Sequence, residues 1–300
     1  MCCVHKMYYI KRIEKGTMED RLRRKYSKAY RSRARRMKRA LIGFTIAITI
    51  ILCGLCLCVA KREENSRKTI ANLMLTALQP VGSTMYVWGG GWGDEEIRAK
   101  ADSVRIGISP RWAEFAAEQD SDYDFNRTRY QRHDGLDCSG YIGWCIYNVM
   151  ETKSGEEGYV MKATKMASTY AKWGWGDFTE AEEVEDWKAG DIMSMDGHVW
   201  MVVGTCEDGS VVFLHSTPPG VSIAGTLLSD GSESEASQLA ETYMSTYFPD
   251  WYERYPECGK EYSYLTTSEA MRWNRRTLLD EEGLTKMSAE EVLEWLFSNR

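Results

Sequence analysis

The stretch HDGLDCSGYIGWCIYN, residues 133–148, holds two cysteines seven positions apart. Cys138 follows an aspartate and precedes Ser-Gly, at the point where a loop enters a predicted helix. A thiol in that place faces free backbone N–H groups and the positive end of the helix dipole, which lower its pKa. Cys145 lies two turns further on, about 10 Å along the helix, and a disulfide requires a Cα separation of about 4.4–6.8 Å. The two cysteines therefore do not pair, and Cys138 is the candidate nucleophile while Cys145 is a core residue.

A thiolate nucleophile needs a base, and residues 61–300 contain three histidines. His198 opens the apolar stretch HVWMVVG, and His215 ends the stretch VVFLH. Antiparallel pairing places both side chains on one face of a sheet if the connecting loop has an even number of residues. A base and the group that orients its ring need this placement at one end of adjacent strands. We therefore expect His198 and His215 to form such a pair, whereas His133 is interpreted as a solvated loop residue.

A zinc site made of Cys138, His198 and His215 is an alternative interpretation of the same three residues. The sequence lacks the C-x-x-C or H-x-x-x-H spacing of common zinc sites around them. We therefore expect neither a metal ion nor a cofactor in this protein.

Four sequence blocks together resemble the NlpC-type, papain-like cysteine peptidases of bacterial cell walls. Their order, spacing and strand context agree with that family, and they are YVWGG (86–90), DCSG (137–140), GDIMSMDGHVWMVVG (190–204) and FLHSTPPGV (213–221). The resemblance covers about half of the chain, roughly residues 80–224. It implies an α+β fold in which the helix that bears the catalytic cysteine packs on a small antiparallel sheet. It also implies hydrolysis of peptidoglycan stem peptides, typically after the γ-linked D-glutamate.

The resemblance assigns a role to each catalytic candidate. Cys138 would be the nucleophile that forms an acyl-enzyme. His198 would be the general base and later the acid, and His215 would orient the ring of His198.

Three further positions match residues that surround the nucleophile in this family. Tyr86 would point its hydroxyl at the developing oxyanion, beside the backbone N–H of Cys138. Asp137 and Ser139 flank the nucleophile and would contact the substrate, although Asp137 could equally serve as the helix cap.

The chain departs from the family pattern in two places. The usual short connection between YVWGG and DCSG is replaced by residues 91–136, an insertion rich in charged and aromatic residues that would shape or cover the substrate groove. Residues 226–300 follow the predicted peptidase domain, 80–225, and are interpreted as a helical extension. Near its end, Ser288 and Glu291 form the sequence pattern of a capping box.

An uncharged run of 21 residues, ALIGFTIAITIILCGLCLCVA, occupies residues 40–60. As a helix it would span roughly 31 Å, which matches the hydrocarbon core of a bilayer. Residues 1–39 carry 15 Lys and Arg against 3 Asp and Glu. The positive-inside rule then keeps this tail in the cytoplasm. The sequence thus predicts a single-pass protein of the cell membrane, with a juxtamembrane linker at 61–79 and an extracellular catalytic domain.

The expected partners follow from this arrangement. They are peptidoglycan stem peptides, the lipid bilayer through residues 40–60, and other cell-envelope proteins. The basic tail is interpreted as a topology signal and not as a nucleic-acid site. Cys206 and Cys258 could form an external disulfide or remain two free thiols.

Two alternative functions stay open. One is a peptidoglycan amidase or acyl transferase of the same fold. The other is a catalytically silent wall-binding module of a secretion or conjugation apparatus. A pure binding module has no need for Cys138, His198 and His215 together, and residues 61–300 are acidic, with 41 Asp and Glu against 23 Lys and Arg.

Overall fold

The structure is a computed structural model that divides the chain into two units, Met1–Glu63 and Glu64–Arg300. It describes residues 23, 25–28, 33, 37–39, 41–46, 48–49, 67–93, 101–129 and 131–300. The described residues of the first unit are helical and exposed.

The prediction of a transmembrane helix over residues 40–60 is corrected by the structure. Among the residues just given, no helix combines the length and the apolar character needed to cross a bilayer. Residues 40, 47 and 50–60 of the predicted span, and residues 61–66 of the predicted linker, lie outside the described residues. The predicted single-pass membrane location, with its extracellular catalytic domain, is therefore withdrawn.

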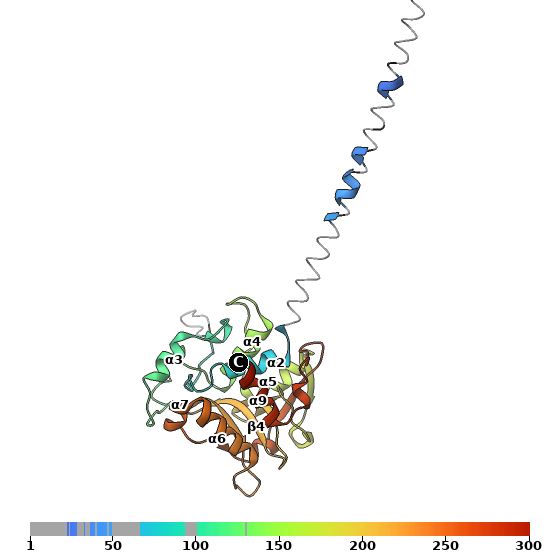
Figure 1. Cartoon of the computed structure of the whole chain (residues 1–300). Helices are drawn as coiled ribbons and strands as arrows, with labels where there is room; N and C mark the ends of the chain where they lie inside the picture. Colours follow the sequence, from blue (N-terminus) through green and yellow to red (C-terminus); the bar gives the residue numbers. More distant parts are fainter. Residues whose placement is uncertain are drawn as a thin grey trace, which may run out of the picture. The chain divides into compact units, whose positions relative to one another are not determined.

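The second unit has an α+β fold built on a seven-stranded mixed sheet (Figure 1). The strand order is β1-β7-β2-β3-β4-β5-β6, and all neighbours are antiparallel except β5 and β6, which are parallel. The strands are β1 (Gly176–Thr179), β2 (Ile192–Met195), β3 (His198–Thr205), β4 (Val211–Thr217), β5 (Gly220–Thr226), β6 (Gly259–Lys260) and β7 (Glu269–Trp273).

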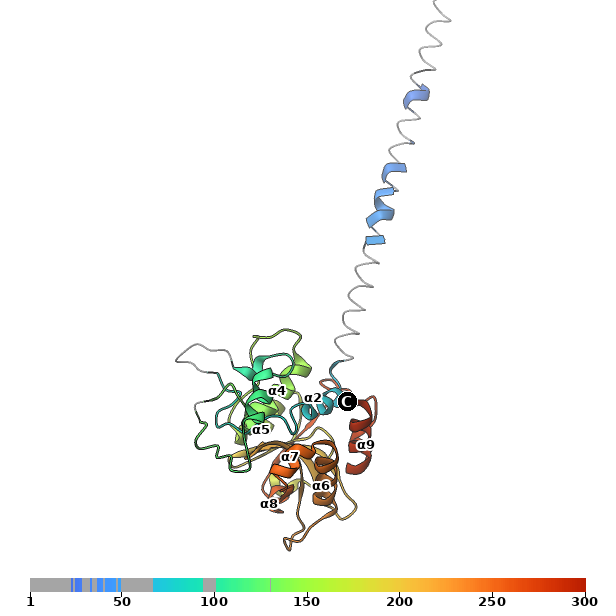
Figure 2. The ribbon, with the colours of Figure 1, turned by 60° about the vertical axis from the view of Figure 1, so that its left-hand side comes forward.

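The helices of this unit are short, and several of them pack on the sheet (Figures 1 and 2). The α-helices are α2 (Ile70–Leu78), α3 (Pro110–Ala117), α4 (Cys138–Met150), α5 (Met166–Lys172), α6 (Glu235–Tyr247), α7 (Pro249–Arg254), α8 (Ser263–Thr266) and α9 (Ala289–Asn299). The single-turn 3-10 helices are η1 (Asp102–Val104), η2 (Ala163–Lys165), η3 (Ala181–Glu183) and η4 (Leu284–Lys286).

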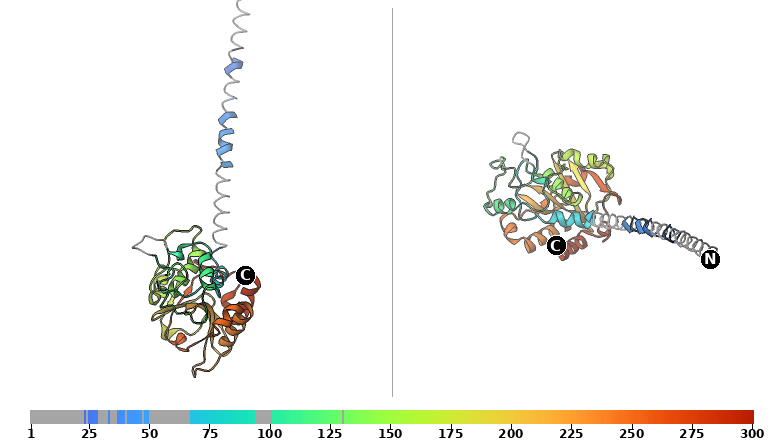
Figure 3. Two further views of the ribbon diagram at one scale, coloured as in Figure 1. Left: turned by 90° about the vertical axis from the view of Figure 1, so that its left-hand side faces the viewer. Right: turned by 90° about the horizontal axis from the view of Figure 1, so that it is seen from above.

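Alternation along the central strands gives the sheet two apolar faces. On β3, Val199 and Met201 belong to the large core that contains residues of α2, α4, α6 and α9. Trp200 and Val202 point the other way, into a smaller cluster that is closed by Leu265 of α8. Helix α2 lies beside the C-terminal helix α9 (Figure 3). The large core holds α4 against one face of the sheet, and the small cluster covers the opposite face.

Helix α4 begins at Cys138 because Asp137 caps it. The carboxylate of Asp137 accepts a hydrogen bond from the backbone N–H of Gly140 at 2.7 Å. The hydroxyl of Tyr141 donates to the carbonyl of Ala77 in α2 at 2.7 Å. A Cβ at Gly140 would collide with the carbonyl oxygen of Gly90, so glycine is required where the YVWGG segment crosses the helix start.

The segment predicted as a helical extension also supplies two strands. Strand β6 pairs with β5, and β7 pairs with both β1 and β2. The sheet is therefore larger than the small antiparallel sheet expected, because residues far along the chain complete it. Arg272 of β7 fixes this arrangement by hydrogen bonds to Asp191 (2.6 Å) and Asp186 (2.8 Å). The predicted capping box at Ser288 and Glu291 is present at the start of α9.

Candidate active site

Cys138 occupies the first turn of α4, and its side chain is buried except for 7% of its surface. Its Sγ lies 3.9 Å from the carbonyl oxygen of Gly197. The backbone N–H of Val199 also interacts with the sulfur. The thiol therefore touches the main chain on both sides of His198, the first residue of β3.

A cleft of about 640 Å³ opens beside the thiol. Four predicted site residues line it, namely Tyr86, Asp137, Cys138 and Ser139, whereas His198 and His215 do not. The insertion 91–136 contributes to the lining, as expected of a segment that shapes the groove. The other lining residues are Trp88, Gly89, Trp92, Gly93, Arg132, Lys162, Ala163, Thr164, Asp196 and Gly197.

The two predicted histidines meet directly. His198 Nε2 lies 3.2 Å from His215 Nδ1, within hydrogen-bond distance. His215 is fully buried and His198 is partly buried. The structure thus brings together a candidate base and a group able to orient it.

A β-bulge is responsible for this meeting. Residues 206–210 connect β3 and β4, and five is an odd number, which by itself would place the two imidazoles on opposite faces. The register shifts between Val202 and Gly204. The extra residue in β3 reverses the parity, so His198 and His215 share one face.

The thiol and the base are neighbours without a side-chain hydrogen bond. Among the described residues, Gly197 and not His198 receives the hydrogen bond of Cys138 Sγ. Hydrogen bonds between catalytic groups are often long in unliganded sites and tighten when substrate binds. Cys138 therefore lies next to His198 because its sulfur contacts the backbone of the two residues that flank His198, Gly197 and Val199.

Burial decides the protonation state of the thiol. Burial first, and then the nearby carboxylate of Asp137, together raise the pKa of Cys138 to about 12. Backbone N–H groups at the helix start and at Val199 lower this pKa but do not outweigh burial. The sequence-based expectation of a lowered thiol pKa is therefore wrong, and the resting group is a neutral thiol.

The imidazoles are neutral for the same reason. Burial, together with the ammonium of Lys260, lowers the pKa of His198 to about 4. Burial, His198 and Lys260 hold the pKa of His215 well below its usual range. Among the described residues no carboxylate acts on either imidazole, so a buried imidazolium there would have no compensating negative charge.

The remaining predicted site residues form a connected group at the mouth of the cleft. The carboxylate of Asp137 accepts hydrogen bonds from Ser139 Oγ at 2.8 Å and from the backbone N–H of Gly89 at 3.2 Å. Asp137 is thus both a helix cap and an anchor for the YVWGG segment. Burial raises the pKa of Tyr86, and the neighbouring Cys138 and Asp137 add to this, so the hydroxyl stays protonated.

Two aromatic residues next to the site were not among the predicted site residues. The indole N–H of Trp92, from the insertion, donates to Ser139 Oγ at 3.0 Å. The ring of Tyr264, on α8, lies 5.6 Å from the ring of His198. Their sequence surroundings carry no local signal for either contact, since both depend on long-range packing.

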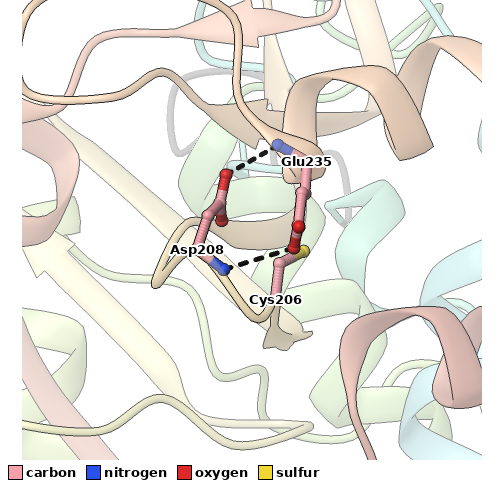
Figure 4. A group of neighbouring side chains, drawn as sticks. All are labelled: Cys206, Asp208 and Glu235. Atoms are coloured by element: carbon pink, nitrogen blue, oxygen red, sulfur yellow. Dashed lines mark hydrogen bonds between the residues drawn. The ribbon is translucent and has the colours of Figure 1, made fainter.

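The structure also contains one group with metal-ligand chemistry, formed by Cys206, Asp208 and Glu235 (Figure 4). Within the described part of the chain, it is the group of three whose ligand atoms all lie within 4.8 Å of one another. The backbone N–H of Glu235 donates to Asp208 at 2.8 Å, and that of Asp208 donates to Glu235 at 3.2 Å. These reciprocal bonds account for the arrangement, because they tie the loop between β3 and β4 to the first residue of α6. Cys206 and Cys258 are both free thiols.

Comparison with models of known protein families, with curated protein sequences and with solved structures found no match for this chain. The function is therefore argued from the geometry of the site and from the sequence resemblance.

Proposed function

We propose that this protein is a cysteine peptidase of the NlpC type that hydrolyses peptidoglycan stem peptides. The observation that carries the proposal is the position of the Cys138 thiol. It lies at a helix start, beside a cleft, and against the backbone on both sides of His198. His198 in turn contacts a second, buried imidazole, that of His215.

The neutral resting state sets the order of proton transfers. His198 takes the thiol proton as the sulfur of Cys138 attacks the carbonyl carbon of the scissile amide. The tetrahedral intermediate collapses, the C–N bond breaks, and the leaving amine takes the proton from His198. A water molecule then loses a proton to His198 as it attacks the acyl-enzyme. The C–S bond breaks, and the thiol regains its proton.

Two donors are available for the developing oxyanion. Tyr86 and Cys138 line the same cleft, and the hydroxyl of Tyr86 remains protonated because burial raises its pKa. The backbone N–H of Cys138 lies in the first turn of α4, where such groups lack partners within the helix. A donor aimed at the oxyanion is worth about 10²–10³-fold in rate.

The lining of the cleft suits a peptide that bears carboxylates. Arg132 and Lys162 are exposed cations at its wall, and Trp88 offers a ring that is 53% exposed. A γ-linked D-glutamate keeps a free α-carboxylate, which such cations attract. This supports a stem-peptide substrate, with cleavage at the γ-D-glutamyl bond taken from the family resemblance.

The test is mass spectrometry of defined peptidoglycan fragments incubated with the purified full-length protein. The proposal expects new peptide ends that disappear with Cys138→Ala. Cys206→Ala is the matched control, since this thiol lies outside the cleft, and it should retain the activity. Equal products from the Cys138→Ala protein would refute the proposal, and cleavage between sugar and L-alanine would identify an amidase.

A wall-binding module without catalysis is the second candidate. The neutral thiol and the missing Cys138–His198 hydrogen bond are the observations that favour it. In that case the fragments stay intact with every variant but bind the protein, which isothermal titration calorimetry measures.

A further inference from the structure

Tyr264 belongs to α8, in the part of the chain that follows the family resemblance. Its ring centroid lies 5.6 Å from that of His198 and 6.3 Å from that of His215. It also packs on Phe213, with the centroids 5.3 Å apart. One side chain from the C-terminal segment therefore contacts both imidazoles.

The position of this ring is fixed from both sides of α8. The chain enters α8 from β6 and leaves it for β7, and both strands are paired in the sheet. Leu265 is buried, and Ser268 accepts a hydrogen bond from the indole N–H of Trp200 at 3.1 Å. Tyr264 is thus held against the histidine pair by its neighbours in sequence.

The hydrogen bond between the imidazoles allows two tautomeric arrangements. In one, His198 Nε2 donates, so His198 Nδ1 is unprotonated and His215 carries its proton on Nε2. In the other, His215 Nδ1 donates and His198 Nδ1 already holds a proton. Only the first arrangement leaves His198 Nδ1 able to accept a proton from a thiol.

The surroundings of His215 Nε2 distinguish the two arrangements. This nitrogen is buried and has no hydrogen-bond partner among the described residues. The rings of Phe213 and Tyr264 pack on the imidazole of His215 at steep angles, with centroids 5.0 Å (86°) and 6.3 Å (69°) from its own. The negative face of an aromatic ring attracts an N–H and repels a lone pair. The aromatic surroundings therefore favour a proton on His215 Nε2.

We propose that Tyr264 is a positioning residue whose ring covers the histidine pair and favours the tautomer in which His198 Nδ1 is unprotonated. This role rests on the proposed function, in which His198 is the base. The ring acts through His215 and His198 and not through a bond to substrate.

Other titratable and charged groups also act on the pair. Lys260 of β6 lies close enough to lower the pKa of both imidazoles. Burial, Cys138 of α4 and Glu261 raise the pKa of Tyr264. None of them is altered by a substitution of Tyr264, so a change in the pair can be assigned to the ring.

The test uses three substitutions in the full-length protein. Tyr264→Phe keeps the ring, Tyr264→Leu replaces it by an aliphatic group, and Tyr262→Leu is the control at an exposed neighbouring tyrosine. Nitrogen NMR of the chain's 4 histidines reports the tautomer and pKa of each imidazole. The signal of His133, which pairs with Asp102 at 2.8 Å, reports whether the fold is intact.

We expect Tyr264→Phe and Tyr262→Leu to leave the tautomer of the pair unchanged and hydrolysis within about threefold of the parent. Tyr264→Leu should shift His198 toward the Nδ1-protonated form, raise both pKa values and reduce kcat/KM about tenfold or more. An unchanged tautomer in Tyr264→Leu, or loss of the tautomer in Tyr264→Phe, overturns the inference. Absence of hydrolysis by the parent protein refutes the proposed function instead, and the NMR result stands apart from it.

Discussion

His198 Nε2 and His215 Nδ1 lie 3.2 Å apart, in a pair that burial keeps uncharged. A buried hydrogen bond of this kind holds a ring more firmly than solvent contacts do, because an unpaired imidazole would lose hydrogen-bond energy inside the protein. The pair therefore determines the orientation of His198.

Removing the hydrogen-bond acceptor at residue 215 should leave the ring of His198 without a fixed orientation. We expect His215→Leu to reduce kcat/KM by about 100-fold or more, because His198 Nε2 then has no acceptor. His215→Asn should retain activity within about tenfold, since its amide oxygen can accept the same bond. Hydrolysis of stem peptides measures both variants. His133→Asn is the control outside the pair, and equal losses in the Leu and Asn variants would contradict the orienting role.

The thiol of Cys138 should be alkylated slowly at neutral pH. Its raised pKa, about 12, means that the thiolate fraction grows about tenfold with each pH unit from 7 to 10 without levelling off. Iodoacetamide labelling of the Cys138 peptide, followed by mass spectrometry, measures the rate. The denatured protein is the reference, and its rate should level off near the ordinary thiol pKa. A plateau near pH 7 in the folded protein would show a stabilised thiolate and contradict this expectation.

Removing the charge of Asp137 should activate the thiol. The carboxylate raises the pKa of Cys138, so Asp137→Asn should increase its alkylation rate at pH 8 by about three- to tenfold. The Asn oxygen can still accept the bond from Gly140, so the helix cap remains. Asp196→Asn is the matched control, because Asp196 lines the same cleft but is exposed. An equal increase in both variants would mean that losing any negative charge at the cleft speeds alkylation, and that the Asp137 carboxylate has no particular effect.

Arg272 should be important for stability because it compensates the buried Asp191, which is only 2% exposed. Arg272→Leu leaves this carboxylate without its cation. Because a third of the Arg272 side chain is exposed, we expect a loss of about 2–4 kcal/mol in the free energy of unfolding, less than the ~3–5 kcal/mol of a fully buried pair. Denaturant titration measures it. The exposed Arg276→Leu serves as control, and a loss of the same size there would exclude the ion pair as the cause.

Local patterns were sufficient to predict the elements that carry the candidate site. Apolar stretches of strand length predicted strands near β3 and β4, and the cap at Asp137 is visible in the sequence. The capping box at Ser288 was predicted for the same reason, since its partners are three residues apart.

The features that could not be predicted from the sequence depend on packing between segments far apart in the chain. Strand β7 pairs with β1 and β2, whose residues lie about 75 to 100 positions earlier, so no local pattern announces it. The bulge near Val202 is one extra residue in an otherwise regular strand. The pKa of Cys138 depends on burial by distant segments, which outweighs the local helix start.

The place of β7 between β1 and β2 has a consequence for biosynthesis. A nascent chain contains Cys138, His198 and His215 well before residues 269–273 have left the ribosome. Until then β1 and β2 lack the strand that joins them, and their edges are open to other chains. The catalytic candidates are thus synthesised early, but the sheet that supports them is completed only once residues 269–273 have emerged.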